Sequence, residues 1–339
     1  MWSRRTLLKA GSAAVAVGAV AGGVAYQRYR RTGGLVSERI TGEWPEVGVS
    51  SWLLPDLDGA LMQVPDRPHD KEELGESGRG GGITRVRQFT VSTSSRRLRG
   101  DRHGSAPAAG VKRYVGVGDS TTFGWGVPDD RTWPAQLEAA LGAGGHRAEV
   151  LNAGVPGQAL ENMKAWLEHA APQLGLSGVF FTRRLPPMPN PYAEYASAVR
   201  AAQRALPGVR IMVLLPPVSQ FDPHGCDVWD DEVAGLRAQL PDIPVFDLTP
   251  GVRAAQGKRG ARMLVEGRTW HMVRGEADER LVSGAAAPHG LPRAFYDRFE
   301  SDATVREALF FDDGHCDEEG LAVTVPLIVE QMRGAGWLA

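Results

Sequence analysis

Alternation of short apolar runs with amphipathic segments, from about residue 111 onward, is the feature that most restricts the fold of this chain. Each apolar run has the length of a buried strand, and each amphipathic segment is long enough for a helix. The predicted strands lie within 113–120, 148–154, 178–182, 209–217 and 243–249, and the predicted helices span 132–142, 159–171, 191–206, 228–240 and about 318–333. This order predicts an α/β fold, a three-layer doubly wound sandwich with a central parallel sheet of about five strands. In such a sheet ligands bind beyond the carboxyl ends of the strands, so the residues that follow each strand are the candidates for chemistry.

Composition excludes several classes of protein. The chain has 339 residues, with 38 Lys and Arg against 40 Asp and Glu, a formal net charge of −2. Nucleic-acid-binding domains normally carry a basic excess, so no nucleic-acid partner is expected. An apolar fraction of 42% beside 23% charged residues excludes a wholly disordered chain and a protein with several membrane spans. The two cysteines, Cys226 and Cys316, are too few for a disulfide framework. They either pair once in an oxidising compartment or remain two buried thiols.

The first 33 residues have the pattern of an export signal rather than of a folded element. Arg4 and Arg5 precede an uncharged run, rich in Ala and Gly, that reaches Ala25. A basic start before a short apolar segment is typical of export signals, and the paired arginines indicate the twin-arginine route. We therefore expect a periplasmic or extracellular protein that uses the twin-arginine export machinery. Anchoring to the membrane through residues 7–26 is the alternative to removal of the signal.

Residues 34–110 form a predicted N-terminal extension ahead of the main domain at 111–339. The polar, Gly-rich stretch at 65–82 predicts a loop or flexible linker. Short alternating runs within 83–100 predict a small β element that leads into the main domain.

Two short motifs carry candidate catalytic residues. Ser120 follows the first predicted strand in the run Gly-Asp-Ser-Thr-Thr-Phe-Gly, whose glycines permit a tight turn that exposes the hydroxyl. A serine in an ordinary turn or helix cap is the alternative. Asp312 and His315 lie three residues apart, so the carboxylate can orient the imidazole and leave its other nitrogen to accept a proton. A solvated acidic loop with a surface histidine is the alternative there. No histidine spacing typical of a metal site occurs, and we expect neither a metal nor a cofactor.

Taken together, these motifs resemble the SGNH hydrolases, the superfamily of GDSL esterases and lipases. Residues 118–124 are similar to the first sequence block of that family, and residues 152–157 resemble its second block. Asp312 and His315 match the last block, and a predicted helix follows them as it does in the family. The resemblance covers about residues 83–335 and rests on three blocks in the right order.

The resemblance implies a flavodoxin-like SGNH fold and a Ser-His-Asp triad. Ser120 would be the nucleophile, His315 the general base and Asp312 the residue that orients it. The backbone N–H groups of Ser120 and Gly157 would bind the oxyanion. Asp119 and Asn152, which lie in the first two blocks, are placed with the oxyanion and substrate-binding residues. The implied activity is hydrolysis of an ester of a lipid, a small molecule or an acetylated glycan.

The third block of the family is degenerate in this chain. A Gly-x-Asn-Asp should follow the third strand, but Thr182, Arg183 and Arg184 stand there. Loss of one oxyanion donor, which the asparagine would supply, typically costs about 100- to 1,000-fold in rate. Arg183 or Arg184 is the candidate replacement, with Gln158 and Asn162 also near the expected site. Alternatively, both arginines face solvent or pair with acids. A catalytically weak or inactive glycan-binding protein, or an O-acyltransferase, is the alternative to the hydrolase.

Overall fold

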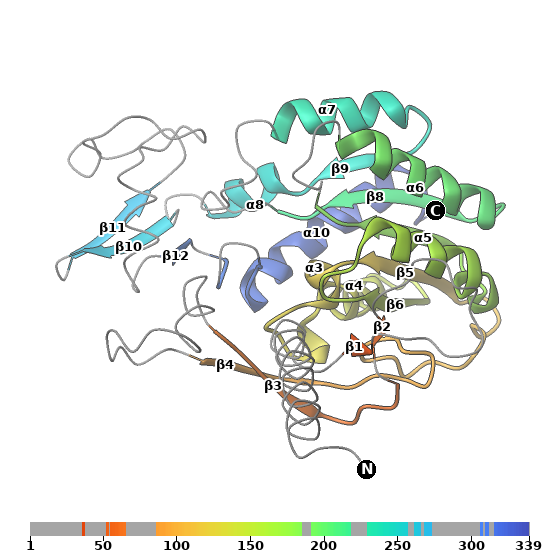
Figure 1. Cartoon of the computed structure of the whole chain (residues 1–339), viewed down its shortest axis with the longest axis horizontal. Helices are drawn as coiled ribbons and strands as arrows, with labels where there is room; N and C mark the ends of the chain where they lie inside the picture. The colour runs from red at the N-terminus through yellow and green to blue at the C-terminus, as the bar shows by residue number, and fades with distance from the viewer. Residues whose placement is uncertain are drawn as a thin grey trace, which may run out of the picture.

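The computed structural model describes residues 36–37, 52–53, 55–65, 86–184, 191–217, 229–256, 261–265, 268–272, 306–307, 309–311 and 315–338. At its centre is a five-stranded parallel sheet with the strand order β6-β5-β7-β8-β9 (Figure 1). The strands are β5 (Lys112–Gly118), β6 (Ala148–Gly154), β7 (Gly178–Thr182), β8 (Arg210–Leu215) and β9 (Val245–Asp247). Their order reverses once, after the first two strands, which is the flavodoxin-like arrangement. The predicted central parallel sheet of about five strands is confirmed.

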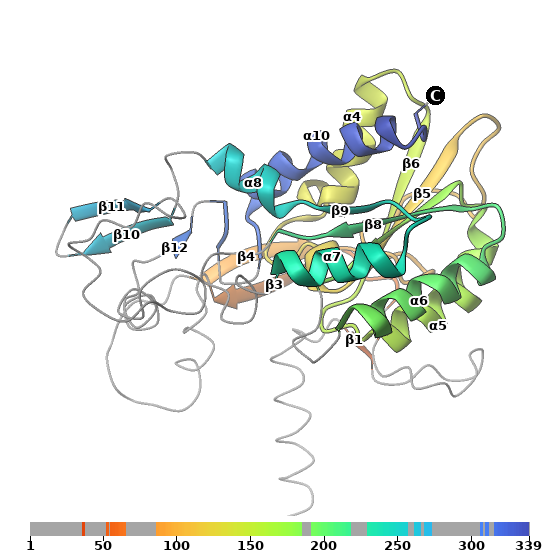
Figure 2. The same cartoon turned by 90° about the horizontal axis from the view of Figure 1, so that it is seen from above.

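Helices cover both faces of the sheet, as Figure 2 shows from above. One face carries α5 (Leu160–His169), α6 (Pro191–Ala205) and α7 (Trp229–Gln239), and the other carries α4 (Trp133–Ala143), α8 (Thr249–Gln256) and α10 (Glu318–Gly334). Two separate clusters of buried apolar side chains fill the layers between sheet and helices. The predicted three-layer sandwich is therefore confirmed.

Local signals account for most of the helix boundaries. Thr132 caps α4, because its hydroxyl accepts a hydrogen bond from the backbone N–H of Ala135 at 3.5 Å. The prediction that Gly142 stops this helix was wrong, since α4 continues to Ala143 and Gly144 forms the C-cap. A single exposed glycine lowers helix propensity without ending a helix whose other face is buried.

Some elements had no clear signal in the sequence. Helix α8 begins at Thr249, where the fifth predicted strand ends, and no helix was predicted there. A small antiparallel sheet with the order β11-β10-β12 was also not predicted. Its strands are β10 (Ala261–Val265), β11 (Arg268–Met272) and β12 (Arg306–Glu307).

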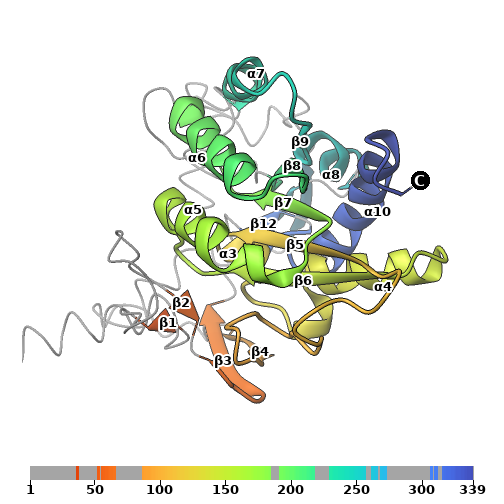
Figure 3. The same ribbon diagram turned by 90° about the vertical axis from the view of Figure 1, so that its right-hand side faces the viewer.

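The N-terminal extension packs beside the helix that begins with Ser120 (Figure 3). It contains two antiparallel pairs, β1 (Val36–Ser37) with β2 (Trp52–Leu53) and β3 (Ala60–Pro65) with β4 (Val86–Val91). A third apolar cluster joins these strands to the start of the main domain; its members are Leu53, Met62, Phe89, Val91, Phe123, Trp125, Val155 and Phe311. The division into signal, extension and main domain stays a prediction, and its first 33 residues and Cys226 lie outside the described residues. Within the described part of the chain, no helix combines the length and apolarity needed to cross a membrane.

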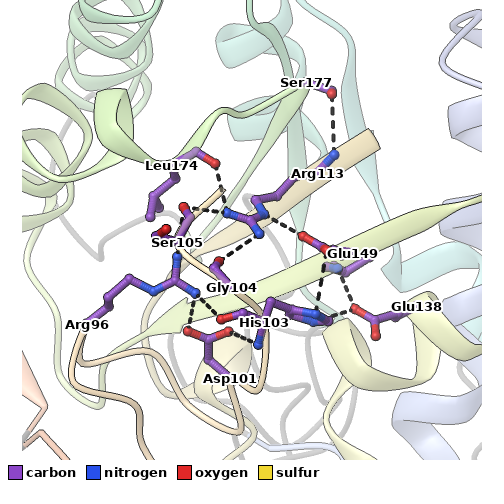
Figure 4. A network of polar contacts seen from close by, with 11 residues as sticks. Arg96, Asp101, His103, Gly104, Ser105, Arg113, Glu138, Glu149, Leu174 and Ser177 are labelled. Atoms are coloured by element: carbon purple, nitrogen blue, oxygen red, sulfur yellow. Dashed lines mark hydrogen bonds and ion pairs between the residues drawn. The ribbon is translucent and has the colours of Figure 1, made fainter. Parts of the chain in front are cut away.

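At the amino-terminal end of the sheet, a buried arginine bonds the segment that precedes β5 (Figure 4). The Arg113 side chain is fully buried; its Nε donates to Glu149 at 2.6 Å, and its other nitrogens donate to the carbonyls of Gly104, Ser105 and Leu174. His103 lies 3.0 Å from a carboxylate oxygen of Glu138 in the same network. Because every carbonyl and the carboxylate accept from one guanidinium, this cluster fixes residues 103–105 against β5 and β6.

Candidate active site

Ser120 is placed by the turn between β5 and a one-turn helix, α3 (Ser120–Phe123). Asp119 is the N-cap of this helix, and its Oδ1 accepts hydrogen bonds from the backbone N–H of Thr121 at 2.9 Å and from the Thr121 hydroxyl at 2.8 Å. Gly118 has no room for a side chain, since a Cβ there would lie 1.9 Å from the carbonyl oxygen of Thr182. The strand can therefore pass close to β7 and still turn sharply enough to present the serine. Asp119, expected among the substrate-binding residues, is occupied with capping.

The structure brings Ser120 and His315 together, although 195 positions separate them in the sequence. The Oγ of Ser120 lies 2.8 Å from the Nε2 of His315, which is hydrogen-bonding and proton-transfer distance. The imidazole is half-buried and stacks on Phe311, with ring centroids 5.8 Å apart. The Phe311 N–H also donates to the His315 carbonyl at 3.0 Å, so the turn that carries the histidine is closed on itself. Asp312, the third candidate of the triad, lies outside the described residues.

An apolar pocket opens beside the Ser120–His315 pair. The space between its walls is about 470 Å³, a volume that includes the open mouth and the solvent in it. Helix α10 contributes Leu321, Thr324 and Ile328 to the wall, and β8 ends at the pocket with Pro216 and Pro217. The full lining is Ser120, Thr121, Gly124, Trp125, Trp133, Thr182, Leu214, Pro216, Pro217, Leu248, His315, Cys316, Leu321, Thr324 and Ile328. None of these side chains is a carboxylate, lysine or arginine, so the pocket suits an uncharged, largely aliphatic group.

The second block supports the serine turn from the neighbouring strand. The side chain of Asn152 accepts from the Gly154 N–H at 3.0 Å and donates to the carbonyl of Phe123 at 3.3 Å, so it joins the end of β6 to α3. The Val155 N–H donates to the carbonyl of Gly118 at 3.0 Å. Gly157 follows in the same turn with a φ of +72°, a conformation that favours glycine, and it is exposed. Asn152 thus has a structural partner on each side, and Gly157 lies in a loop bonded to the strand end that precedes Ser120.

The third block places two arginines against the carboxyl edge of the sheet. The Arg183 Nε donates to the backbone carbonyl of Gln158 at 3.0 Å, and Arg184 donates to the carbonyl of Pro217 at 3.3 Å. Both side chains are half-buried. The acceptors in these two contacts are backbone carbonyls, one in the loop between β6 and α5 and one just after β8.

The other two candidates near the expected site are both buried. Gln158, between β6 and α5, and Asn162, in the first turn of α5, are each 1% exposed. The Gln158 carbonyl is the acceptor for Arg183. The buried phenol of Tyr195 donates to the carbonyl of Arg183 at 3.1 Å, and burial raises its pKa far above the ordinary value. Arg183 is therefore bonded both to the loop before α5 and to α6.

Sequence reasoning missed the residues that shape the pocket. Trp125 and Trp133 line it, yet tryptophan in a helix or loop is ordinary core composition and gives no directional signal. Thr182 also lines it, and its carbonyl accepts from the Thr122 hydroxyl at 3.3 Å. The sequence did place Thr182, at the carboxyl end of a predicted strand, among the residues expected at the ligand-binding edge of the sheet.

A serine hydroxyl bonded to an imidazole at the carboxyl edge of a doubly wound parallel sheet is the arrangement of an SGNH-type hydrolase. The model of the GDSL-like Lipase/Acylhydrolase family matches residues 117–323, more than half of the chain. The protein therefore belongs to this family of SGNH hydrolases. No match to a curated protein sequence was found.

Several solved structures share the general fold. A lipase/acylhydrolase from Enterococcus faecalis is 14% identical, with a TM-score of 0.42 over 66% of this chain and 96% of its own. The acetyl xylan esterase AlAXEase is 12% identical, with a TM-score of 0.43 over 65% of this chain and 98% of its own. A two-domain esterase (CEX) active on acetylated mannans is 12% identical, with a TM-score of 0.41 over 65% of this chain and 48% of its own. Likeness at this level carries no argument about the substrate of this chain.

Proposed function

We propose that this protein is a serine esterase that hydrolyses esters of a small, uncharged acyl group. The observation that carries the proposal is the 2.8 Å contact between Ser120 Oγ and His315 Nε2 at the mouth of an apolar pocket. A serine hydroxyl is a weak nucleophile by itself, and a neighbouring imidazole is the usual base that activates it.

In the proposed reaction, His315 Nε2 accepts the proton of Ser120 as the Oγ attacks the ester carbonyl. The carbon–oxygen π electrons move to the carbonyl oxygen, and the N–H groups of Ser120 and Gly157 stabilise this oxyanion. The tetrahedral intermediate collapses, the bond to the alcohol oxygen breaks, and His315 returns its proton to the leaving alcohol. Water, deprotonated by His315, then attacks the acyl-enzyme and releases the acid. We assign Asp312 the role of orienting the imidazole through its other nitrogen.

The pocket supports an assignment for the acyl side of the substrate. Besides Ser120, His315, Cys316 and three threonines, the lining is of Leu, Ile, Pro, Trp and Gly residues, and it holds no carboxylate, lysine or arginine to pair with a charged group. An aliphatic acyl group fits this environment, and the alcohol portion would extend toward solvent from Ser120. That alcohol is a lipid, a small alcohol or the sugar of an acetylated glycan.

Replacement of Ser120 tests the proposal directly. Ser120→Ala should reduce hydrolysis of p-nitrophenyl acetate or butyrate to background, a loss of roughly a million-fold by analogy with other serine hydrolases. The same variant should no longer react with a fluorophosphonate probe. Ser105→Ala is the matched control, because Ser105 is exposed at the other end of the sheet. Hydrolysis or labelling at the parental rate in Ser120→Ala would refute the assignment.

A second candidate function is supported by the degenerate third block. With Thr182, Arg183 and Arg184 in place of the asparagine motif, one oxyanion donor of the family pattern is absent. A non-catalytic glycan-binding protein on this fold would leave Ser120 unlabelled by the probe while it still binds acetylated glycans. An O-acyltransferase would instead be labelled and would transfer its acyl group to an added sugar faster than to water.

We also propose that the protein is exported by the twin-arginine pathway through residues 1–33. The support is the Arg4-Arg5 pair ahead of a weakly apolar run. Fractionation of cells that produce the chain should place it outside the cytoplasm. Replacement of both arginines by lysine should retain it inside, whereas unchanged export would contradict the route.

A further inference from the structure

The helix that carries Ser120 is too short to be stable by itself. Helix α3 has four residues, so it closes a single turn, and isolated turns of this length do not persist in water. The carbonyl groups at the end of a helix have no partners within it and must find them elsewhere. The position of the serine therefore depends on groups outside α3 that donate hydrogen bonds to its carbonyls.

One arginine bonds the last carbonyl of α3, which Asn152 also bonds, and two carbonyls of the loop after it. Arg99, which lies in the N-terminal extension, donates through Nη1 to the carbonyls of Phe123 at 2.6 Å and Gly124 at 2.7 Å. Its Nη2 donates to the carbonyl of Val127 at 2.5 Å. The guanidinium also lies over the Phe123 ring, 4.2 Å from its centroid. The end of α3 and the loop that follows are thus held by a single planar donor group.

This clamp acts on the backbone of Ser120 through two hydrogen bonds. The N–H groups of Gly124 and Trp125 both donate to the carbonyl of Ser120, each at 3.0 Å. Trp125 also lines the apolar pocket. A shift of the loop that Arg99 holds would therefore move the nucleophile and the pocket wall together.

Arg99 is itself held by Asp129 and Asn152 of the main domain. Its side chain is fully buried, and its Nε donates to Asp129 at 2.8 Å. The other carboxylate oxygen of Asp129 accepts from the backbone N–H of Ser92 at 2.8 Å. The Arg99 N–H donates to the carbonyl of Asn152. Burial lowers the pKa of Arg99 to about 10, so the side chain stays charged at neutral pH.

We propose that Arg99 is a positioning residue for Ser120, and that the catalytic unit of this protein therefore includes residues 86–100. This segment lies ahead of residue 117, where the match to the family begins. The inference rests on the proposed function, because it requires Ser120 to be the nucleophile. It assigns the extension a part in catalysis rather than that of a spacer.

A pair of double variants separates positioning from general stability. Arg99→Gln with Asp129→Asn removes both charges at once, which avoids leaving a single buried charge and is the better tolerated change. Arg113→Gln with Glu149→Gln is the matched control, since Arg113 is equally buried and bonds one carboxylate and three carbonyls at the far end of the sheet (Figure 4). Both proteins are compared with the parent chain by thermal unfolding and by the kinetics of fluorophosphonate labelling.

We expect both pairs of substitutions to lower Tm, but only the Arg99 pair to slow bond formation at Ser120. The maximal labelling rate per folded molecule should fall roughly 10- to 100-fold, the scale of a 1 Å displacement of a reacting group. The probe concentration at half-maximal rate should stay within about twofold, because the defect lies in orientation rather than in binding. The control pair should label at the parental rate.

Three results would overturn the inference. Equal labelling rates for the two double variants would show that Arg99 does not position Ser120. If neither the Arg99 double variant nor the conservative Arg99→Lys variant folds while the control double variant does, Arg99 is needed for folding of the whole domain and not specifically for positioning Ser120. If the parent chain is not labelled at Ser120, the proposed function fails, and the inference fails with it. If the parent chain is labelled and the Arg99 variants are labelled at the same rate, the proposed function is retained and only the role of Arg99 is refuted.

Discussion

Gly118→Ala tests whether close approach of β5 and β7 determines where Ser120 lies. A Cβ at this position would lie 1.9 Å from the Thr182 carbonyl oxygen, 1.5 Å short of an ordinary 3.4 Å contact, and 2.2 Å from the Thr122 hydroxyl. A threonine side chain can rotate away, but a backbone carbonyl in the sheet cannot. The strand end must therefore move by an amount comparable to that deficit.

The expected effects follow from this displacement. Overpacking of this kind costs about 1–3 kcal/mol, or roughly 2–12 °C in Tm for a domain of this size. A displacement above 1 Å so close to the nucleophile should lower the rate of ester hydrolysis by about 100-fold or more. Thermal unfolding and p-nitrophenyl ester kinetics measure the two effects, with the rate expressed per folded molecule.

Gly142→Ala is the matched control for the same chemical change. Gly142 lies on the exposed side of α4, and nothing lies within 4 Å of a Cβ built there. Alanine should stabilise the helix by roughly 0.5–1 kcal/mol without affecting activity. If Gly118→Ala behaved like this control, retaining both Tm and activity, the argument that the strand contact positions Ser120 would be refuted.

Two further predictions concern the pocket and a pair of carboxyl groups on α5 and α6. Ile328→Ala should enlarge the pocket at α10 and lower stability by about 2–5 kcal/mol. The ratio of kcat/KM for a longer acyl ester to kcat/KM for acetate should rise about fourfold for each added methylene that the pocket accommodates. An unchanged chain-length profile would place the acyl group elsewhere. The pKa of Glu194 is raised, chiefly by a hydrogen bond with Glu161, so the stability that Glu194 contributes is present at low pH and is lost as pH rises through its raised pKa. Glu194→Gln keeps a hydrogen-bonding amide at every pH, so its Tm relative to the parent should increase between about pH 4 and pH 8; a constant difference would contradict this.

Most of the sheet could be predicted because its signals are local. Strand β6 and strand β7 have the bounds that the pattern of apolar residues predicts, and α6 differs from its prediction by one residue at its end. Helix α8 was not predicted: Pro250 is compatible with the first turn of a helix, but Gly251 lowers helix propensity, and the helix packs against α10. The strands were predicted correctly from a pattern of apolar residues that repeats along the chain. Helix α8, which was not predicted, packs against a part of the chain far away in the sequence.

The candidate site divides in the same way. The positions of Ser120 and His315 at the end of a strand and ahead of the last helix follow from short motifs and from resemblance to the SGNH hydrolases. The role of Asp119 as an N-cap, the bond of Asn152 to α3 and the contact of Arg183 with the Gln158 carbonyl do not follow from those motifs. A motif identifies a residue type at a position, whereas a hydrogen-bond partner depends on which strands are neighbours.

The sequence by itself determined the alternation of strands and helices, and with it the layers and the edge of the sheet where the motifs lie, because hydrophobic periodicity and capping act over a few residues. Only the tertiary structure decided that the Ser120 hydroxyl lies 2.8 Å from the imidazole of His315, and that Arg99 from the extension holds the helix beneath the serine. Such contacts join residues far apart in the chain. They exist only once the strands have paired in their final order and buried charges have found the carbonyls and carboxylates that compensate them.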